Sequence, residues 1–177
     1  MKSSDANRIS SEAKVYIDRL GMVPHPEGGF YKEIYQPELW IEAGHWSIPV
    51  QGRRRSATSI YFLLPSGDVS RFHRLNADEM WYFHAGSPVC IVTIDSDGKR
   101  IDHHLGLDIQ AGQFPQILVP RGTIFGAYVM DENPNAFALV GCMVTPGFDF
   151  QDFQLLGHIE LLKNFPYHRD IIEKLGG

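Results

Sequence analysis

The stretch from Ser56 to Thr145 constrains the fold most, because it alternates short apolar runs with turn residues about every ten positions. The runs are rich in Val, Ile, Phe and Tyr, whereas Gly, Pro, Asp and Asn separate them. This pattern is typical of an all-β sandwich or barrel. Strands are expected over 58–64, 69–75, 79–85, 88–95, 99–105, 116–120, 124–130 and 137–145.

The segment before this stretch predicts one short helix and one strand. Ser10 or Ser11 can cap an amphipathic helix that ends at Gly21. A strand is expected over 30–35, and a long irregular connection with Trp40 and Trp46 over 36–55.

The segment after Thr145 has a different character. We expect one extended edge segment through Phe148, Phe150 and Phe153, followed by helices over 155–163 and 167–175. No repeat or linker interrupts the chain, so we expect a single domain over 1–177, with a core over about 20–155 and a helical tail over 156–177.

Composition excludes several classes of protein. A chain of 177 residues with a net charge of −5 is not expected to bind nucleic acid or an anionic membrane. No apolar run approaches the length of a membrane span, and the N-terminus is polar, so a cytoplasmic protein is expected. Cys90 and Cys142 lie in apolar runs and are expected to be buried and free of disulfides.

The stretch from Gly67 to Gly86 carries the most chemistry. Two strand-like segments flank a turn at 76–78, and alternation places polar and aromatic side chains on one face of each. These side chains are Arg71, His73 and Leu75 on the first segment and Glu79, Trp81 and Phe83 on the second. If the two faces coincide, they form a polar pocket with aromatic walls inside an apolar barrel. His84 has the opposite parity and is expected to point outward.

The spacing of Gly67, His73, Glu79 and Gly86 resembles the first motif of the cupin superfamily. Three further motifs resemble those of one subfamily of small cupins, DUF985. They are Pro24–Phe30, Phe72–Leu75 followed by Asp78–Trp81, and Pro146–Phe148. The resemblance implies a double-stranded β-helix, the jelly-roll barrel, with a short N-terminal helix and C-terminal helices. It does not fix a function, because one fold hosts many activities.

A cupin metal site would use three His and one Glu. At the matching positions this chain keeps His73 and Glu79 but has Leu75 and Phe125 in place of the other two histidines. A tight metal site needs three or four converging donors, so no metal or other cofactor is expected. Only a weak divalent-metal site at His73 and Glu79 is left open.

The remaining His73–Glu79 pair can act as acid or base, because a carboxylate orients an imidazole and raises its pKa. Its alternative is a structural pair in a core that has lost its metal. Arg71 is the candidate anion clamp, or else forms a surface ion pair. Further candidates for the ligand pocket are Ser59, Tyr61, Trp81, Phe83 and Phe125.

The loop from Pro24 to Gly29 carries two further polar residues. Its prolines and glycines exclude a helix. His25 and Glu27 either fix a turn or contact a ligand, and the sequence leaves both interpretations open.

Two functions remain. The first is a metal-independent isomerase or epimerase of a sugar or nucleotide-sugar, with His73 as base and Glu79 as its orienter. Metal-free jelly-roll epimerases that use a His base support this by resemblance. The second is a non-catalytic binding protein for a small sugar-like or nucleotide-like molecule. A homodimer is expected, because the aromatic segments 30–35 and 36–55 need cover.

Overall fold

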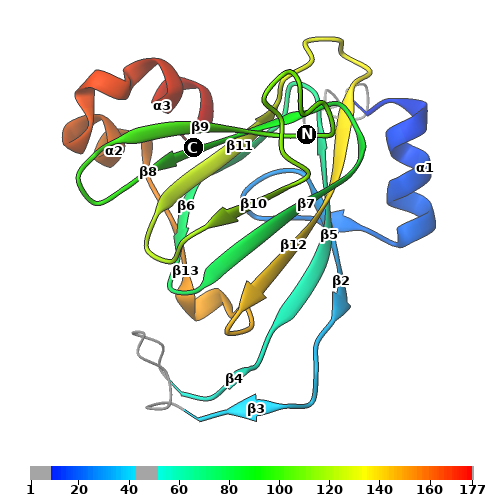
Figure 1. Cartoon of the computed structure of the whole chain (residues 1–177), viewed down its shortest axis with the longest axis vertical. Coiled ribbons are helices and arrows are strands. Elements are labelled where there is room, and N and C mark those ends of the chain that lie inside the picture. The colour runs from blue at the N-terminus through cyan, green and yellow to red at the C-terminus, as the bar shows by residue number, and fades with distance from the viewer. Residues whose placement is uncertain (1–8, 43–51, 177) are drawn as a thin grey trace, which may run out of the picture.

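Two antiparallel β-sheets face each other in the computed structural model, which describes residues 9–42 and 52–176 (Figure 1). The larger sheet has six strands in the order β1-β2-β5-β12-β7-β10. Their bounds are β1 Val23–Pro24, β2 Phe30–Tyr35, β5 Thr58–Pro65, β12 Phe137–Thr145, β7 Asp78–Gly86 and β10 Gln116–Val119.

The smaller sheet has five strands in the order β13-β6-β11-β8-β9. Their bounds are β13 Phe153–Leu155, β6 Val69–Leu75, β11 Ile124–Val129, β8 Val89–Ile94 and β9 Arg100–Leu105. The chain repeatedly crosses from one sheet to the other, as a jelly roll does. The predicted fold class is confirmed, and the expected strands differ from the observed ones by a residue or two at their ends.

The β8–β9 hairpin follows from its turn chemistry. The Asp95 carboxylate accepts hydrogen bonds from the backbone N–H groups of Asp97 and Lys99, both at 2.9 Å. Gly98 has φ 79°, a left-handed conformation that glycine adopts without strain. The hairpin predicted from Asp-Gly between two apolar runs is therefore present.

The helix α1 (Ser11–Leu20) has the predicted caps at both ends. The Ser10 hydroxyl accepts the N–H of Ala13 at 3.2 Å, and Gly21 ends the helix with φ 64°. Ala13 is fully buried where α1 covers part of the outer face of the larger sheet, against Leu63 and Phe137.

The C-terminal helices cover the outer face of the smaller sheet (Figure 1). They are α2 (His158–Asn164), the 3₁₀ turn η2 (Pro166–His168) and α3 (Arg169–Leu175). Leu161, Ile172 and Leu175 bury their side chains against Phe72 and Val92. None of the helices in the described parts of the chain is long and apolar enough to cross a membrane.

The segment 36–55 holds a short ribbon where the sequence predicted an irregular connection. β3 (Trp40–Ile41) pairs with β4 (Arg54–Arg55) and projects beyond the two sheets (Figure 1). The guanidinium groups of Arg53 and Arg55 lie 4.3 and 4.0 Å from the centroid of the Trp40 ring. The prediction for Trp46 lies outside the described residues.

Candidate functional site

A cavity of about 220 Å³ opens between the inner faces of the two sheets. Its lining combines carboxylates, imidazoles and aromatic rings, and His25 packs against both Tyr31 and Phe150. The lining residues are His25, Glu27, Tyr31, Glu33, Thr58, Ile60, Phe62, His73, Leu75, Glu79, Cys142, Val144, Phe148, Phe150 and Phe153.

The loop from Pro24 to Gly29 supplies two of the polar groups. Gly28 has φ 118°, and a Cβ there would lie 2.0 Å from the carbonyl oxygen of Val69. The chain can therefore approach β6 this closely only with glycine at position 28. The Asp68 carboxylate accepts the N–H of Gly29 at 3.0 Å and fixes the end of the loop. As a result His25 and Glu27 reach the cavity.

Arg71 holds the same loop from the other side. Its backbone N–H donates to the Glu27 carbonyl at 2.9 Å, and its Nε donates to that oxygen at 3.3 Å. Its guanidinium also donates to the carbonyl of Pro26. Arg71 does not line the cavity, so its predicted place as an anion clamp in the pocket is wrong. A bulge against β11 shifts the register of β6 at this point and breaks the simple alternation.

His73 pairs with Glu27 rather than with Glu79. Its Nδ1 lies 2.7 Å from the carbonyl oxygen of Arg71, which can only accept, so Nδ1 carries a hydrogen. Its Nε2 lies 3.3 Å from Glu27 Oε2. The imidazole is almost fully buried and packs against the Phe125 ring, with the centroids 4.0 Å apart.

His25 faces the same carboxylate. Its Nδ1 accepts the backbone N–H of Glu27 at 3.3 Å and lies 3.5 Å from Glu27 Oε2. Burial lowers the pKa of His25, and the nearby His73 lowers it further, although Glu27 acts in the opposite direction. The neutral ring therefore carries its hydrogen on Nε2.

The Glu27 carboxylate lies between these two rings and a buried hydroxyl. Ser70 is fully buried, and its Oγ donates to Glu27 Oε1 at 2.7 Å. Oε1 is thus bound by Ser70, whereas Oε2 faces His25 and His73. A buried carboxylate is stable only with such partners.

Glu79 is in the opposite protonation state. Burial raises the pKa of its carboxyl group to about 8, and the negative charge of Glu27 adds to the shift. A hydrogen bond with Cys142 opposes it in part. At neutral pH the Glu79 side chain is therefore a carboxylic acid and can donate a hydrogen bond.

The other predicted ligand residues are placed as follows. Ser59 and Tyr61 lie on the outer face of β5, because Thr58, Ile60 and Phe62 of that strand line the cavity. Their prediction as lining residues is therefore wrong. Trp81, Phe83 and Phe125 face inward but pack in the core instead of lining the cavity.

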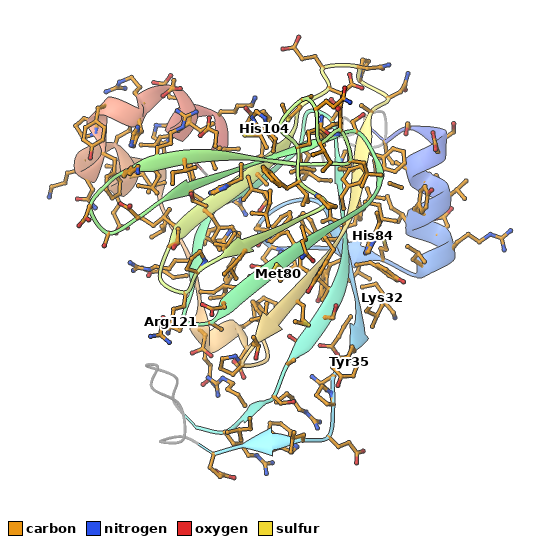
Figure 2. All side chains as sticks on the ribbon, in the orientation of Figure 1. Lys32, Tyr35, Met80, His84, His104 and Arg121 are labelled. Carbon is orange, nitrogen blue, oxygen red and sulfur yellow. The ribbon has the colours of Figure 1, made fainter. Side chains whose placement is uncertain are left out.

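The outer face of β7 carries His84, as parity predicted. His84 is exposed, and its ring meets that of Tyr61 edge-on at 5.8 Å. Figure 2 shows His84 and Lys32 on the side of the sheet that carries α1.

An aromatic wall closes one side of the cavity. Phe148, Phe150 and Phe153 form it, with ring centroids 5.0 to 6.2 Å apart. The prediction of one extended segment is only partly right, since Phe150–Asp152 is a 3₁₀ turn, η1, and only Phe153–Leu155 is a strand. The cluster of phenylalanines around Pro146-Gly147 was the signal that could have identified this wall.

The residues present do not fit the metal site that the cupin fold usually carries. Leu75 and Phe125 occupy the positions at which such a metal site would need two further histidines. Leu75 lines the cavity, and Phe125 packs on His73. Both nitrogens of His73 face other groups, Nδ1 the Arg71 carbonyl and Nε2 the Glu27 carboxylate. Within 9–42 and 52–176, no three His, Cys, Asp or Glu side chains form a group that could hold a metal ion.

Comparisons with known proteins agree on the fold. The family model described as Cupin superfamily (DUF985) matches residues 14–156. The uncharacterised protein YML079W of Saccharomyces cerevisiae is 26% identical over 162 residues, which are 87% of this chain and 80% of that protein.

Solved structures give the same result. Protein SO0799 of Shewanella oneidensis is 44% identical with a TM-score of 0.84, over 93% of this chain and 97% of that one. A hypothetical protein from Leishmania major is 33% identical with a TM-score of 0.82, and the match covers 93% of this chain and 98% of that one. Oxalate decarboxylase of Bacillus subtilis is 15% identical with a TM-score of 0.54. The match covers 87% of this chain and 37% of the decarboxylase chain, and it shows a shared fold alone.

Proposed function

The chain belongs to the cupin superfamily (DUF985), and from that premise we propose that it is a metal-independent isomerase or epimerase of a small polar molecule. One observation carries the proposal. A carboxylate paired with an imidazole and a carboxylic acid that keeps its proton face the same cavity. Two carboxyl groups in opposite protonation states are the arrangement that proton-transfer enzymes use.

The Glu27–His73 pair is the proposed base. The His73 Nε2 and the Glu27 Oε2 atoms face each other across 3.3 Å. The pair removes a proton from a carbon next to a carbonyl group, and the electron pair left on that carbon forms the double bond of an enediol. Glu79 gives its proton to the carbonyl oxygen. A proton then returns to carbon from the pair while one enediol hydroxyl gives its proton back to the Glu79 carboxylate, which re-forms the carbonyl group of the isomer or epimer and restores Glu79.

The size of the cavity limits the substrate. Pockets for drug-sized ligands measure roughly 300–1,000 Å³, and this cavity measures about 220 Å³. A molecule of about the size of one sugar ring fits, whereas a whole nucleotide-sugar would extend outside. The aromatic wall suits the flat apolar side of such a ring.

A binding protein without catalysis is the alternative. It is favoured by one observation, that both nitrogens of His73 and both oxygens of Glu27 already have partners within the protein. A cluster whose members satisfy one another can be purely structural.

Exchange of carbon-bound hydrogen with solvent tests the proposal directly. The protein is incubated in D₂O with a panel of aldoses and ketoses, and deuterium on carbon is followed by NMR. We expect exchange in at least one sugar, with rates about 100-fold or more lower in Glu27→Gln and Glu79→Gln, since general acid–base catalysis contributes 10²–10⁴-fold. Exchange unchanged by a chelator would agree with metal independence.

Two matched controls separate this result from an unspecific loss. Glu132→Gln and His103→Ala remove the same kinds of group outside the cavity and should exchange at the parent rate. If a sugar binds in the cavity but no substrate of the panel exchanges, the protein is a binder and the catalytic proposal fails.

A further inference from the structure

The cavity contains an unusual set of ionisable groups for a metabolite site. Glu27, Glu33 and Glu79 line it, and within the described residues that line it there is no Lys or Arg. Carboxylate and phosphate groups are normally bound by Arg, Lys or several backbone N–H groups. None of the described residues that line this cavity offers an anion a guanidinium or ammonium group.

Arg71 and Arg54 contact segments next to the cavity but bind other groups of the protein. The guanidinium of Arg71 donates to the carbonyls of Pro26 and Glu27. Arg54 pairs with Asp152 behind the aromatic wall, with Nε and Oδ2 2.8 Å apart. Neither lines the cavity, so neither offsets the acidic groups for a bound ligand.

The histidines do not compensate for this lack. Burial lowers the pKa of His25, which disfavours a positive charge on its ring, and His73 Nε2 faces the Glu27 carboxylate at 3.3 Å. Glu33 lies on β2 opposite Ile60 of β5, with its side chain exposed at the opening of the cavity. This exposed carboxylate belongs to the lining that a bound ligand contacts.

The aromatic wall acts in the same direction. The faces of Phe148, Phe150 and Phe153 carry the negative part of each ring quadrupole. Such faces attract a cation within about 6 Å and accept the C–H groups of a neutral ring, whereas they repel an anion. Tyr31 of β2 and Phe62 of β5 add two further rings to the lining.

We propose that the ligand of this cavity is a ring-sized molecule without negative charge, and that a positively charged group is preferred next to Glu33. The inference deepens the proposed function, on which it rests, by naming the substrate class. It excludes carboxylates, sugar phosphates and nucleotide-sugars, and selects uncharged sugars and ring compounds that bear an ammonium or amidinium group.

Three flat probes of the same shape test the charge preference. Benzamidine is a cation, benzamide is neutral and benzoate is an anion at pH 7.5. Each is titrated into the full chain, and the backbone amide signals of 25–31 and 148–153 are followed by NMR. We expect benzamidine and benzamide to bind, and benzoate to bind at least tenfold more weakly than benzamide.

Variants at position 33 test whether the charge preference of the probes arises from Glu33 in the cavity. Glu33→Gln should weaken benzamidine a few-fold and leave benzamide unchanged, and Glu33→Lys should allow benzoate to bind. Glu38→Lys makes the same change in net charge outside the cavity and should have no effect. Benzoate binding as tightly as benzamide, or no binding of any probe, would overturn the inference.

The exchange experiment distinguishes this inference from the proposed function. Deuterium exchange into a sugar phosphate or sugar acid, lost in Glu79→Gln, would support the chemistry and refute the charge preference. If the probes bind in the predicted order but no sugar exchanges hydrogen, the charge preference is supported and the proposed chemistry is refuted.

Discussion

Glu79 is the residue whose ionisation should most affect stability. Its pKa is about 8 in the folded protein, against an ordinary value of 4.5 for the unfolded chain. Between these values the folded state binds more protons than the unfolded state, so the free energy of unfolding falls as pH rises from about 4.5 to about 8. At pH values above both, the burial of a charged Glu79 costs roughly 5 kcal/mol, since each unit of pKa corresponds to about 1.36 kcal/mol.

Glu79→Gln removes this penalty, so the variant should gain stability relative to the parent as pH rises. Urea unfolding at pH 5.5 and pH 8.5 measures the difference. Glu132→Gln, in an exposed loop, should show no such trend. A stability difference between Glu79→Gln and the parent that is the same at both pH values would contradict a raised pKa.

Ser70 is the residue that orients the proposed base. Ser70→Ala deletes the 2.7 Å hydrogen bond to Glu27 Oε1 and leaves a buried carboxylate oxygen without its donor. Hydrogen bonds to charged groups contribute about 1.5–3 kcal/mol, so urea unfolding should show a loss of that size. Ser59→Ala, on the outer face of β5 in the other sheet, should change stability by less than about 0.5 kcal/mol. Equal effects of the two substitutions would mean that Ser70 does not support Glu27.

At the scale of elements, the ion pair between Arg54 and Asp152 attaches β4 to η1 and so supports the aromatic wall. The side chains of Arg54 and Asp152 are 6% and 10% exposed. Removing one partner of a buried ion pair is strongly destabilising, by roughly 3–5 kcal/mol. Asp152→Asn should therefore speed amide hydrogen exchange over 148–155.

Asp97→Asn makes the same change in an exposed turn and should leave that exchange unaltered. If Asp152→Asn and the parent exchange equally over 148–155, the ion pair does not hold the wall in place. In that case the bond from the Phe148 N–H to the Thr58 hydroxyl, at 2.9 Å, would be the main attachment.

Local chemistry explains why the elements could be predicted. Ser10 and Gly21 cap α1, and the apolar runs between turn residues became strands. The orientation of a strand is harder, because alternation alone does not say which of its two faces is buried. Ser59 and Tyr61 were assigned to the wrong face of β5 for this reason.

The site combines residues that local patterns cannot bring together. His73 and Glu79 were found by motif spacing, but their pairing was wrong, since the partner of His73 is Glu27, forty-six positions away in sequence. The bulge in β6 places both Ser70 and His73 toward Glu27, although simple alternation would separate them. Contacts of this kind depend on how the loop packs on β6, which no periodicity shows.

At the scale of the whole molecule, the free edge of β2 is the feature that predicts a homodimer. β1 pairs only with Phe30 and Tyr31, so among the described strands none pairs with that edge over residues 32–35. Ile34 and Tyr35 are 49% and 51% exposed there. An unpaired edge with apolar side chains is a template for strand pairing with another chain. Two copies of β2 can pair antiparallel about a two-fold axis, which makes the contact self-complementary.

Sedimentation equilibrium at micromolar concentration measures the assembly. We expect twice the 20.0 kDa mass of the chain for the parent and a single chain mass for Ile34→Lys, because a charge at the shared edge opposes pairing. Leu107→Lys changes a residue that is 64% exposed elsewhere on the surface and should remain dimeric. A parent protein that sediments as one chain would refute the dimer, and a dimeric Ile34→Lys would place the contact away from β2. Since β2 also carries Tyr31 and Glu33 into the cavity, loss of the dimer should weaken the binding of benzamide and benzamidine together, without changing their order.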